Sequence, residues 1–158
     1  MSDIGGTSVR RAADKAELLD TLLRSKDGGA FGTYRDALVF AAAVGWRHRR
    51  KQPVEGNAGP IDWGTMINRF GTEQLVDVLA FEDSGDVDIL APSRLPERVR
   101  TFESYANGGL EVISELMGVK ALSGAEAVYE LLREALDDHH VDATDGPDLR
   151  DLGRALGL

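Results

Sequence analysis

The feature that most constrains this chain is the triplet Asn107-Gly108-Gly109, which lies inside a helical pattern without ending it. Apolar residues recur at a spacing of three or four on both sides of the triplet, at Val99, Phe102, Ala106, Leu110, Ile113 and Met117. Each glycine costs a helix interior about 1 kcal/mol relative to alanine, so a helix that keeps both has a close neighbour. We expect one helix from Pro96 to Gly118, and we place a neighbouring helix of the same chain before a partner protein or a phosphate backbone.

The composition indicates a single soluble domain. At 158 residues the chain can bury a core without covalent cross-links. It has no cysteine, which excludes disulfides, thiolate nucleophiles and cysteine-based zinc sites and fits a reducing cytoplasm. The N-terminus lacks the apolar core of a secretory signal, and the longest apolar run, at 37–46, is half of the ~20 residues that cross a bilayer. We therefore expect a cytoplasmic protein with no membrane partner.

Helix-start residues and apolar stripes predict an all-α fold. The expected first residues or caps are Asp14, Thr33, Thr72, Pro96, Ser123 and Pro147. Gly45 is expected to end the second helix, and 52–60 and 137–146 are expected to be loops. Because no segment alternates apolar and polar residues, strands are not favoured. We expect a compact single-domain bundle of about six to seven helices over residues 1–158, with a flexible segment 1–10 and more variable helices at 119–158.

Near the C-terminus, Ser123 and Glu126 have the spacing of a capping box, in which each residue satisfies a backbone N–H of the other. The helix that follows carries an apolar stripe made of Val128, Leu131, Leu132, Ala135 and Leu136. We expect this whole stripe to lie in the core.

The sequence contains no residue set that indicates catalysis or a cofactor. A glycine-rich turn at 28–32 lacks the Lys-Ser/Thr of a phosphate-binding loop, and a nucleophile elbow is absent. The acidic segment 137–146 fails the EF-hand pattern, and its adjacent His139 and His140 point in different directions on a helix. We expect no metal and no cofactor. A small hydrolase or nuclease that uses the acidic loops and a metal ion is a third alternative. Glu82, Asp83, Asp86 and Asp88 could hold magnesium in it, although we favour solvation at a helix end for these carboxylates.

Positive charge is concentrated in one cluster after the second helix, at Arg47, Arg49, Arg50 and Lys51, next to Trp46. Residues 1–54 carry a net charge of +4 and residues 55–158 a net charge of −13, within an overall −9. An acidic chain repels phosphate at long range, but a local cluster can bind phosphate at contact distance, with Trp46 stacking on a base. The alternative to phosphate binding, which we favour, is that the cluster is a solvated helix end and that the Trp46 side chain is anchored in the core.

Three segments carry a resemblance to a known family. They are 32–45 (GTYRDALVFAAAVG), 60–63 (PIDW) and 102–111 (FESYANGGLE). Together they resemble the fourth dnd-system-associated family, whose members are encoded beside the bacterial and archaeal machinery for DNA phosphorothioation and its linked restriction. The likeness covers about residues 10–118. It implies an accessory or regulatory role in defence against foreign DNA, and it implies no catalytic residue.

These observations give two main hypotheses. The first is a non-enzymatic accessory protein that contacts other proteins of the modification and restriction system. Its candidate interface residues are Tyr34, Arg35, Tyr105, Asn107, Gly108 and Gly109, together with the acidic C-terminal part. Tyr34, Arg35 and Tyr105 have the alternative of pairing across the core. The second hypothesis is a DNA-binding regulator that uses Arg47, Arg49, Arg50 and Lys51.

Overall fold

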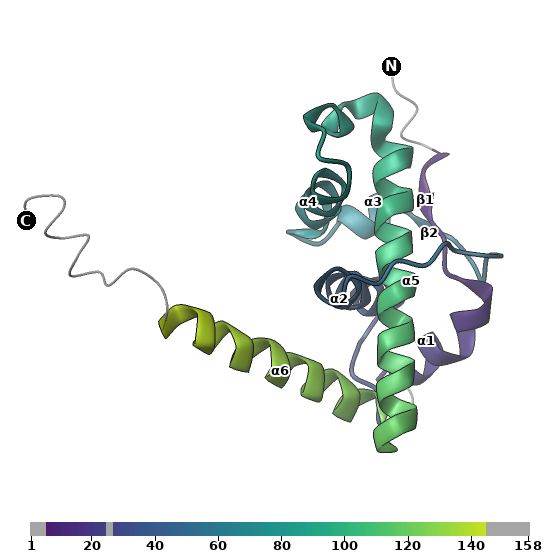
Figure 1. Ribbon diagram of the computed structural model, residues 1–158. Coiled ribbons are helices and arrows are strands. Elements are labelled where there is room, and N and C mark those ends of the chain that lie inside the picture. Colours follow the sequence, from purple (N-terminus) through teal and green to yellow (C-terminus); the bar gives the residue numbers. More distant parts are fainter. Residues whose placement is uncertain (1–5, 25–26, 145–158) are drawn as a thin grey trace, which may run out of the picture.

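The protein folds into a mostly helical body with one long helix at its centre and another that leaves it. The computed structural model describes residues 6–24 and 27–144. Its elements are β1 (Ser8–Val9), η2 (Ala13–Lys15), α1 (Ala16–Leu22), α2 (Tyr34–Arg47), β2 (Ile61–Asp62), α3 (Trp63–Ile67), α4 (Thr72–Ser84), η3 (Val87–Leu90), η4 (Pro92–Arg94), α5 (Leu95–Lys120) and α6 (Gly124–Thr144). The all-α prediction is confirmed, and Figure 1 shows α2 and α4 on one side of α5 and α1 on the other.

The central helix α5 runs through its two glycines without a break, as expected. Phe102, Leu110 and Ile113 on α5 are fully or almost fully buried, against apolar side chains of α1, α2 and α4. The neighbour that the glycines admit is α2. A Cβ atom at Gly109 would lie 1.7 Å from the carbonyl oxygen of Ala41. The backbones of the two helices are therefore in direct contact, which no other residue type would allow at that position.

The second helix makes the same kind of contact from its own side. A Cβ atom at Gly45 would lie 2.0 Å from the carbonyl oxygen of Tyr105. Gly45 is thus a packing residue and not the end of α2, which continues to Arg47. The chain turns away two residues later, where Arg49 has the left-handed φ of +53°. The start of α2 agrees with the sequence, because the Thr33 hydroxyl accepts a hydrogen bond from the Asp36 backbone N–H at 3.2 Å.

The N-terminal segment, expected to be flexible up to residue 10, forms a strand from Ser8 to Val9. This strand pairs antiparallel with β2, with Val9 opposite Ile61, and the Val9 side chain is fully buried. Arg10 then forms an ion pair with the buried Glu103 of α5, at 2.7 Å between Nη2 and Oε2, and its backbone N–H donates to the same carboxylate. Two-residue strands are too short to give a periodic signal, which is why the sequence did not predict them.

Other helix boundaries also differ from expectation. Asp14 does not cap the first helix, because α1 begins at Ala16 with Lys15 as its N-cap and has no side-chain cap hydrogen bond. The N-cap of α4 is Gly71, with a φ of +91°, and Thr72 is the buried first residue of that helix. Helix α5 passes Gly118 and ends at Lys120, with Ala121 in the left-handed region. The predicted polar loop at 137–146 is helical up to Thr144, where α6 ends. The short last helix expected from Pro147 lies outside the described residues.

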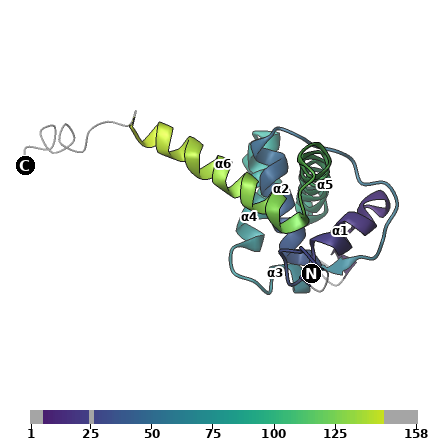
Figure 2. The ribbon, with the colours of Figure 1, turned by 90° about the horizontal axis from the view of Figure 1, so that it is seen from below.

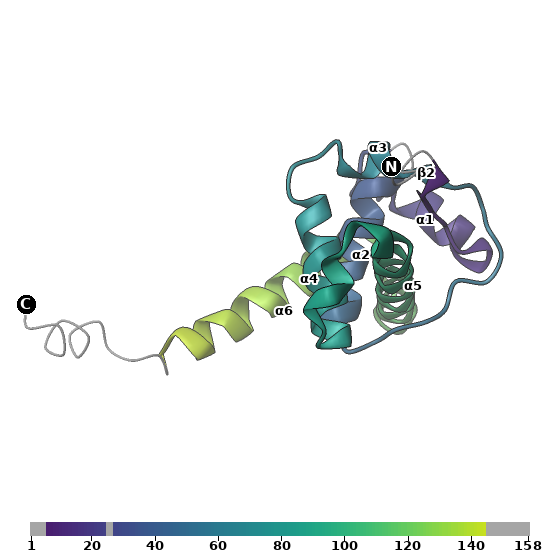
Figure 3. The same cartoon turned by 90° about the horizontal axis from the view of Figure 1, so that it is seen from above.

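The buried side chains that hold helix α6 to the body lie in its first half. The capping box is confirmed, since the Glu126 carboxylate accepts from the Ser123 backbone N–H at 2.7 Å and the Ser123 hydroxyl accepts from Glu126 at 3.3 Å. Ala127, Val128 and Leu131 are buried against the body. Beyond them the helix points away from the other helices, as Figures 2 and 3 show from below and from above. A helix in this position is solvated around most of its circumference, which fits its largely acidic sequence.

Candidate functional site

The predicted basic cluster lies beside a surface depression where three helices meet. The C-terminal end of α2, the end of α4 and the middle of α5 surround a hollow of about 590 Å³. It is lined by Trp46, Arg47, Arg49, Lys51, Glu82 and Tyr105. The structure thus brings together residues that are up to 59 positions apart in the sequence. We take this depression as the candidate site.

Most cations of the cluster already have acidic partners. Arg50 pairs with Glu115 at 2.8 Å and with Glu111 at 3.5 Å, and Lys51 pairs with Asp83 at 2.5 Å. Arg47 pairs with Asp138 of α6. Arg49 is exposed and forms no ion pair with any residue in the described part of the chain. Exposed pairs of this kind contribute about 0–1 kcal/mol, so they reduce the pull of the cluster on phosphate without blocking access to it.

The aromatic residue of the cluster is placed differently from the interpretation we favoured. Trp46 was expected to anchor in the core, but 47% of its surface is exposed and it lines the depression. It follows the apolar run of α2, yet it falls on the face that α5 leaves uncovered. An indole that is half-exposed beside cations can stack on a planar ligand or on a side chain of a partner.

Tyr105 forms the inner wall of the depression through two contacts. Its hydroxyl donates a hydrogen bond to Asp83 Oδ1 at 3.0 Å, and Lys51 Nζ lies 5.6 Å from the centre of its ring. Burial, followed by the hydrogen bond to Asp83, raises the pKa of the Tyr105 phenol. The phenol therefore stays protonated at neutral pH and holds Asp83 and Lys51 in place.

The glycines proposed for an interface lie inside the folded chain. Gly108 and Gly109 are buried under α2 and the segment that follows it, so the expectation that they form an exposed surface is corrected. Asn107 is also buried, and its Nδ2 donates to the Pro53 carbonyl oxygen at 3.0 Å. The internal neighbour that we placed first is the one observed. These three residues fix the loop after α2 against α5.

Tyr34 and Arg35 lie at the opposite end of α2 from the depression. Twelve residues separate Tyr34 from Trp46, which corresponds to about 18 Å along a helix. The Tyr34 hydroxyl donates to Asp20, and the Arg11 guanidinium lies 4.1 Å from the centre of its ring. Arg35 pairs with Asp36 and donates to the Thr65 carbonyl oxygen at 3.2 Å. Both residues hold neighbouring elements to α2, and neither joins the depression.

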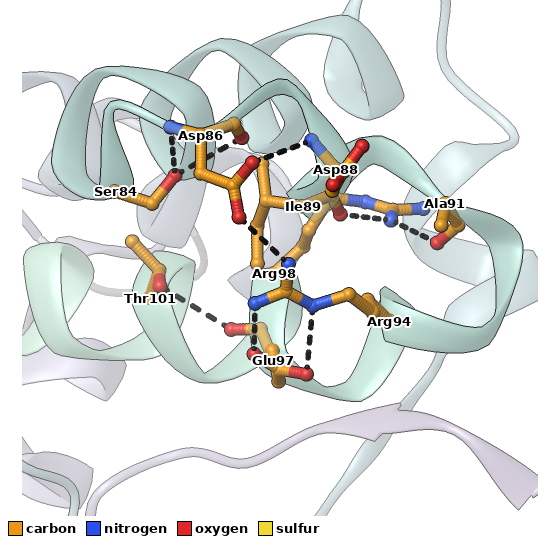
Figure 4. A network of polar contacts seen from close by, with 9 residues as sticks. All are labelled: Ser84, Asp86, Asp88, Ile89, Ala91, Arg94, Glu97, Arg98 and Thr101. Atoms are coloured by element: carbon orange, nitrogen blue, oxygen red, sulfur yellow. Dashed lines mark hydrogen bonds and ion pairs between the residues drawn. The ribbon is translucent and has the colours of Figure 1, made fainter.

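Two of the four carboxylates considered for a metal, Asp83 and Asp86, have structural partners. Figure 4 shows Asp86 accepting from the Asp88 backbone N–H at 2.9 Å and pairing with Arg94 at 3.2 Å. These two contacts, the backbone hydrogen bond first, lower the pKa of Asp86. Asp83 is occupied by Lys51 and Tyr105, as described above. Among the side chains that the structure describes, at 6–24 and 27–138, no three His, Asp or Glu residues gather in the way that a metal ion requires.

The same region contains a buried arginine that the sequence did not single out. Arg98 is 6% exposed, and its Nη1 donates to the carbonyl oxygens of Ile89 and Ala91 at 2.7 and 2.8 Å (Figure 4). Its Nε lies 2.8 Å from Asp77 Oδ1 as an ion pair without the alignment of a hydrogen bond. Arg98 thus ties η3 to both α4 and α5 and supports the turn below the acidic residues.

Helix α6 carries a second set of residues that sequence reasoning placed wrongly. Leu132 and Leu136 were expected in the core with Leu131, but 49% and 63% of their surfaces are exposed, and Tyr129 is 66% exposed. The apolar stripe of α6 is wider than the face that the body covers. The sequence did contain a sign of this width, because the adjacent residues Leu131 and Leu132 are 100° apart on a helix and widen its apolar stripe.

Among the residues that the structure describes, no helix combines the length and apolarity needed to span a bilayer.

Comparisons with known proteins give one match, to a family. No curated protein and no solved structure matches the chain. A family model does match, over residues 8–152, and extends well past residue 118, where the resemblance seen in the sequence ended. On this match, the chain belongs to the family of DNA sulphur modification system-associated protein 4.

Proposed function

We propose that this protein is a non-enzymatic accessory component of a DNA sulphur modification system and works by contact with other proteins of that system. The family gives the association with DNA sulphur modification. Linked restriction and defence against foreign DNA are the biological setting that we propose for it. In this role the protein supplies binding surfaces to larger partners.

The observation that carries this proposal is the set of large apolar side chains at the surface. Phe70 is fully exposed, and Val78 and Phe81 on α4 are 55% and 43% exposed. A groove of about 790 Å³ lies beside Phe70, between α2, the start of α4 and the segments that precede them, and its lining includes the apolar side chains of Phe31, Phe40 and Leu75. With the exposed face of α6, these residues give a small acidic protein several apolar patches, which is typical of surfaces that partners cover.

Co-purification tests this proposal directly. We expect the tagged protein, co-expressed with the modification and restriction proteins of the same system, to retain at least one of them through gel filtration. The double variant Val78→Ser/Phe81→Ser measures the contribution of the α4 surface, and Val119→Ser, which removes an exposed side chain at the end of α5, is its control. If the tagged protein elutes alone while the modification proteins still bind one another, the proposed function is wrong.

A second candidate function, binding of DNA, is favoured by one specific arrangement. The half-exposed Trp46 lies at the depression together with Arg49, which forms no ion pair with the side chains that the structure describes, and a stacked base and a phosphate could both be held there. The carboxylates that surround the other cations, and the net charge of −9, oppose this function. We therefore rank it below protein contact.

Charge reversal at Arg49 separates the two candidates. If the depression binds DNA, Arg49→Glu lowers the affinity for single-stranded DNA by about tenfold and reduces the slope of log affinity against log salt by about one. Arg100→Glu, at an exposed position of α5, is the matched control and should leave both unchanged. Fluorescence anisotropy at several salt concentrations measures these values. Absence of binding by the unmodified protein at low salt rules out the second candidate.

A further inference from the structure

Helix α6 has two faces with different roles. Ala127, Val128 and Leu131 hold it to the body, and Asp138 on the same side pairs with Arg47 of α2. At 100° per residue, Tyr129, Leu132 and Leu136 lie within about 60° of one another and well away from the centre of the attached face. The second face is therefore the outer part of the wide apolar stripe of α6, about two turns long, and the described residues leave it uncovered.

One border of this stripe is acidic. Glu126, Glu130 and Asp137 lie along it, and Arg133, the single cation of α6 in the described side chains, lies between them and the stripe. Arg133 is already bound, to Glu130 at 3.0 Å and to Asp137 at 3.4 Å. Hydrogen bonds from Arg133 and from the Ser123 backbone lower the pKa of Glu130 and of Glu126, respectively. These carboxylates are therefore ionised at neutral pH, and the border is negative.

The charge beside the stripe decides what kind of partner fits it. A second copy of α6 would place carboxylates against carboxylates. Nucleic acid would be repelled by the same border. A helix with an apolar stripe and lysines or arginines beside it matches both the apolar side chains and the carboxylates.

We propose that the exposed face of α6 binds a basic amphipathic helix of a partner protein, with Tyr129, Leu132 and Leu136 as the apolar contact and the acidic border as the charge contact. This inference rests on the proposed function, because it names the chemistry of one of the partners. It adds that the docking element is a helix, that it carries positive charge, and that α6, not the depression at Trp46, receives it.

Two synthetic peptides test this inference with the full-length protein. Each is an amphipathic helix of roughly 18 residues, about five turns, with leucine on one face and either lysine or glutamate on the other. We expect the leucine-lysine peptide to bind with an affinity that falls as salt rises, and the leucine-glutamate peptide not to bind. The double variant Leu132→Ser/Leu136→Ser should weaken binding about tenfold or more, with an unchanged circular dichroism spectrum. Val87→Ser, at an exposed apolar position of η3 and off α6, is the control and should bind normally.

Several results would overturn the inference. Equal binding of the lysine peptide to the protein and to its α6 double variant would show that attraction to the acidic chain is general. Equal binding of both peptides would show that charge does not select the partner. Binding of neither peptide would show that the exposed face of α6 does not bind an amphipathic helix. Self-association that the double variant abolishes would identify a second copy as the occupant. If the double variant still co-purifies with the modification proteins, the proposed α6 site is wrong while the proposed function stands. If the unmodified protein co-purifies with none of them, the proposed function itself is wrong.

Discussion

Replacement of Gly109 by alanine is expected to destabilise this protein by at least about 3 kcal/mol, at the upper end of what overpacking costs. The added Cβ would lie 1.7 Å from the Ala41 carbonyl oxygen and 2.9 Å from the Gly45 backbone nitrogen. Both are backbone atoms of a regular helix, so no change of side-chain rotamer can relieve the overlap. Helix α2 would have to move away from α5, and much of the core between them would separate with it. Urea denaturation followed by circular dichroism measures the loss.

Gly118→Ala is the matched control for this prediction. Gly118 lies in the same helix, is exposed, and has nothing within 4 Å of the position of an added Cβ. Alanine there should stabilise the protein by about 0.5–1 kcal/mol, because it has the higher helix propensity. A Gly109→Ala protein as stable as Gly118→Ala would mean that α2 and α5 are not in backbone contact, and the description of the core given above would be wrong.

Replacement of Arg10 by alanine is expected to cost about 2–3 kcal/mol, somewhat less than the loss of a partner in a fully buried ion pair. The Glu103 carboxylate is 3% exposed and receives two close contacts from the Arg10 guanidinium, at 3.0 and 2.7 Å. Without that side chain, a buried negative charge keeps one backbone N–H donor, at 2.9 Å. The expected value is reduced because 42% of the Arg10 side chain is exposed and water can partly replace it. Thermal and urea unfolding measure the change.

Lys120→Ala serves as the comparison for Arg10→Ala. Lys120 pairs with Glu130 at 3.7 Å, and both side chains are accessible to solvent. Its removal should change the stability by less than about 0.5 kcal/mol. Equal losses from the two substitutions would indicate that Glu103 has access to water in the folded protein, contrary to its position under β1.

Local signals in the sequence predicted much of the fold. The apolar spacing on both sides of Gly108 predicted the central helix and its close internal neighbour, and the caps at Thr33 and Ser123 were correct. Each depends on residues within a few positions of one another. The strand at Ser8–Val9 was not predicted, because its stability comes from a pairing with residues more than fifty positions away.

The sequence predicted which residues share an apolar helical face better than it predicted how much of each face is buried. The pattern places Leu132, Leu136 and Trp46 on apolar faces, but it does not say how far a neighbouring helix extends over them. The candidate site shows the same limit. The sequence singled out Arg47, Arg49, Lys51 and Tyr105, whereas the position of Glu82 at the depression and the pairing of Lys51 with Asp83 depend on how α4 packs against α5.

Among the described residues, the buried contacts of α6 lie in its first half and the Arg47–Asp138 ion pair is at the surface, so the outer part of the helix can act as a lever. The 21 residues of α6 span about 30 Å, so a rotation of 10° at its base displaces its tip by roughly 5 Å. The base is the contact in which Gly124 meets Leu22 and the Gly28 backbone, where a Cβ atom would lie 3.0 and 3.3 Å from those neighbours. A small change in packing at this pivot would therefore shift anything carried along the arm by the width of a side chain. The angle between two assembled proteins can thus be set by a few atoms far from where they touch.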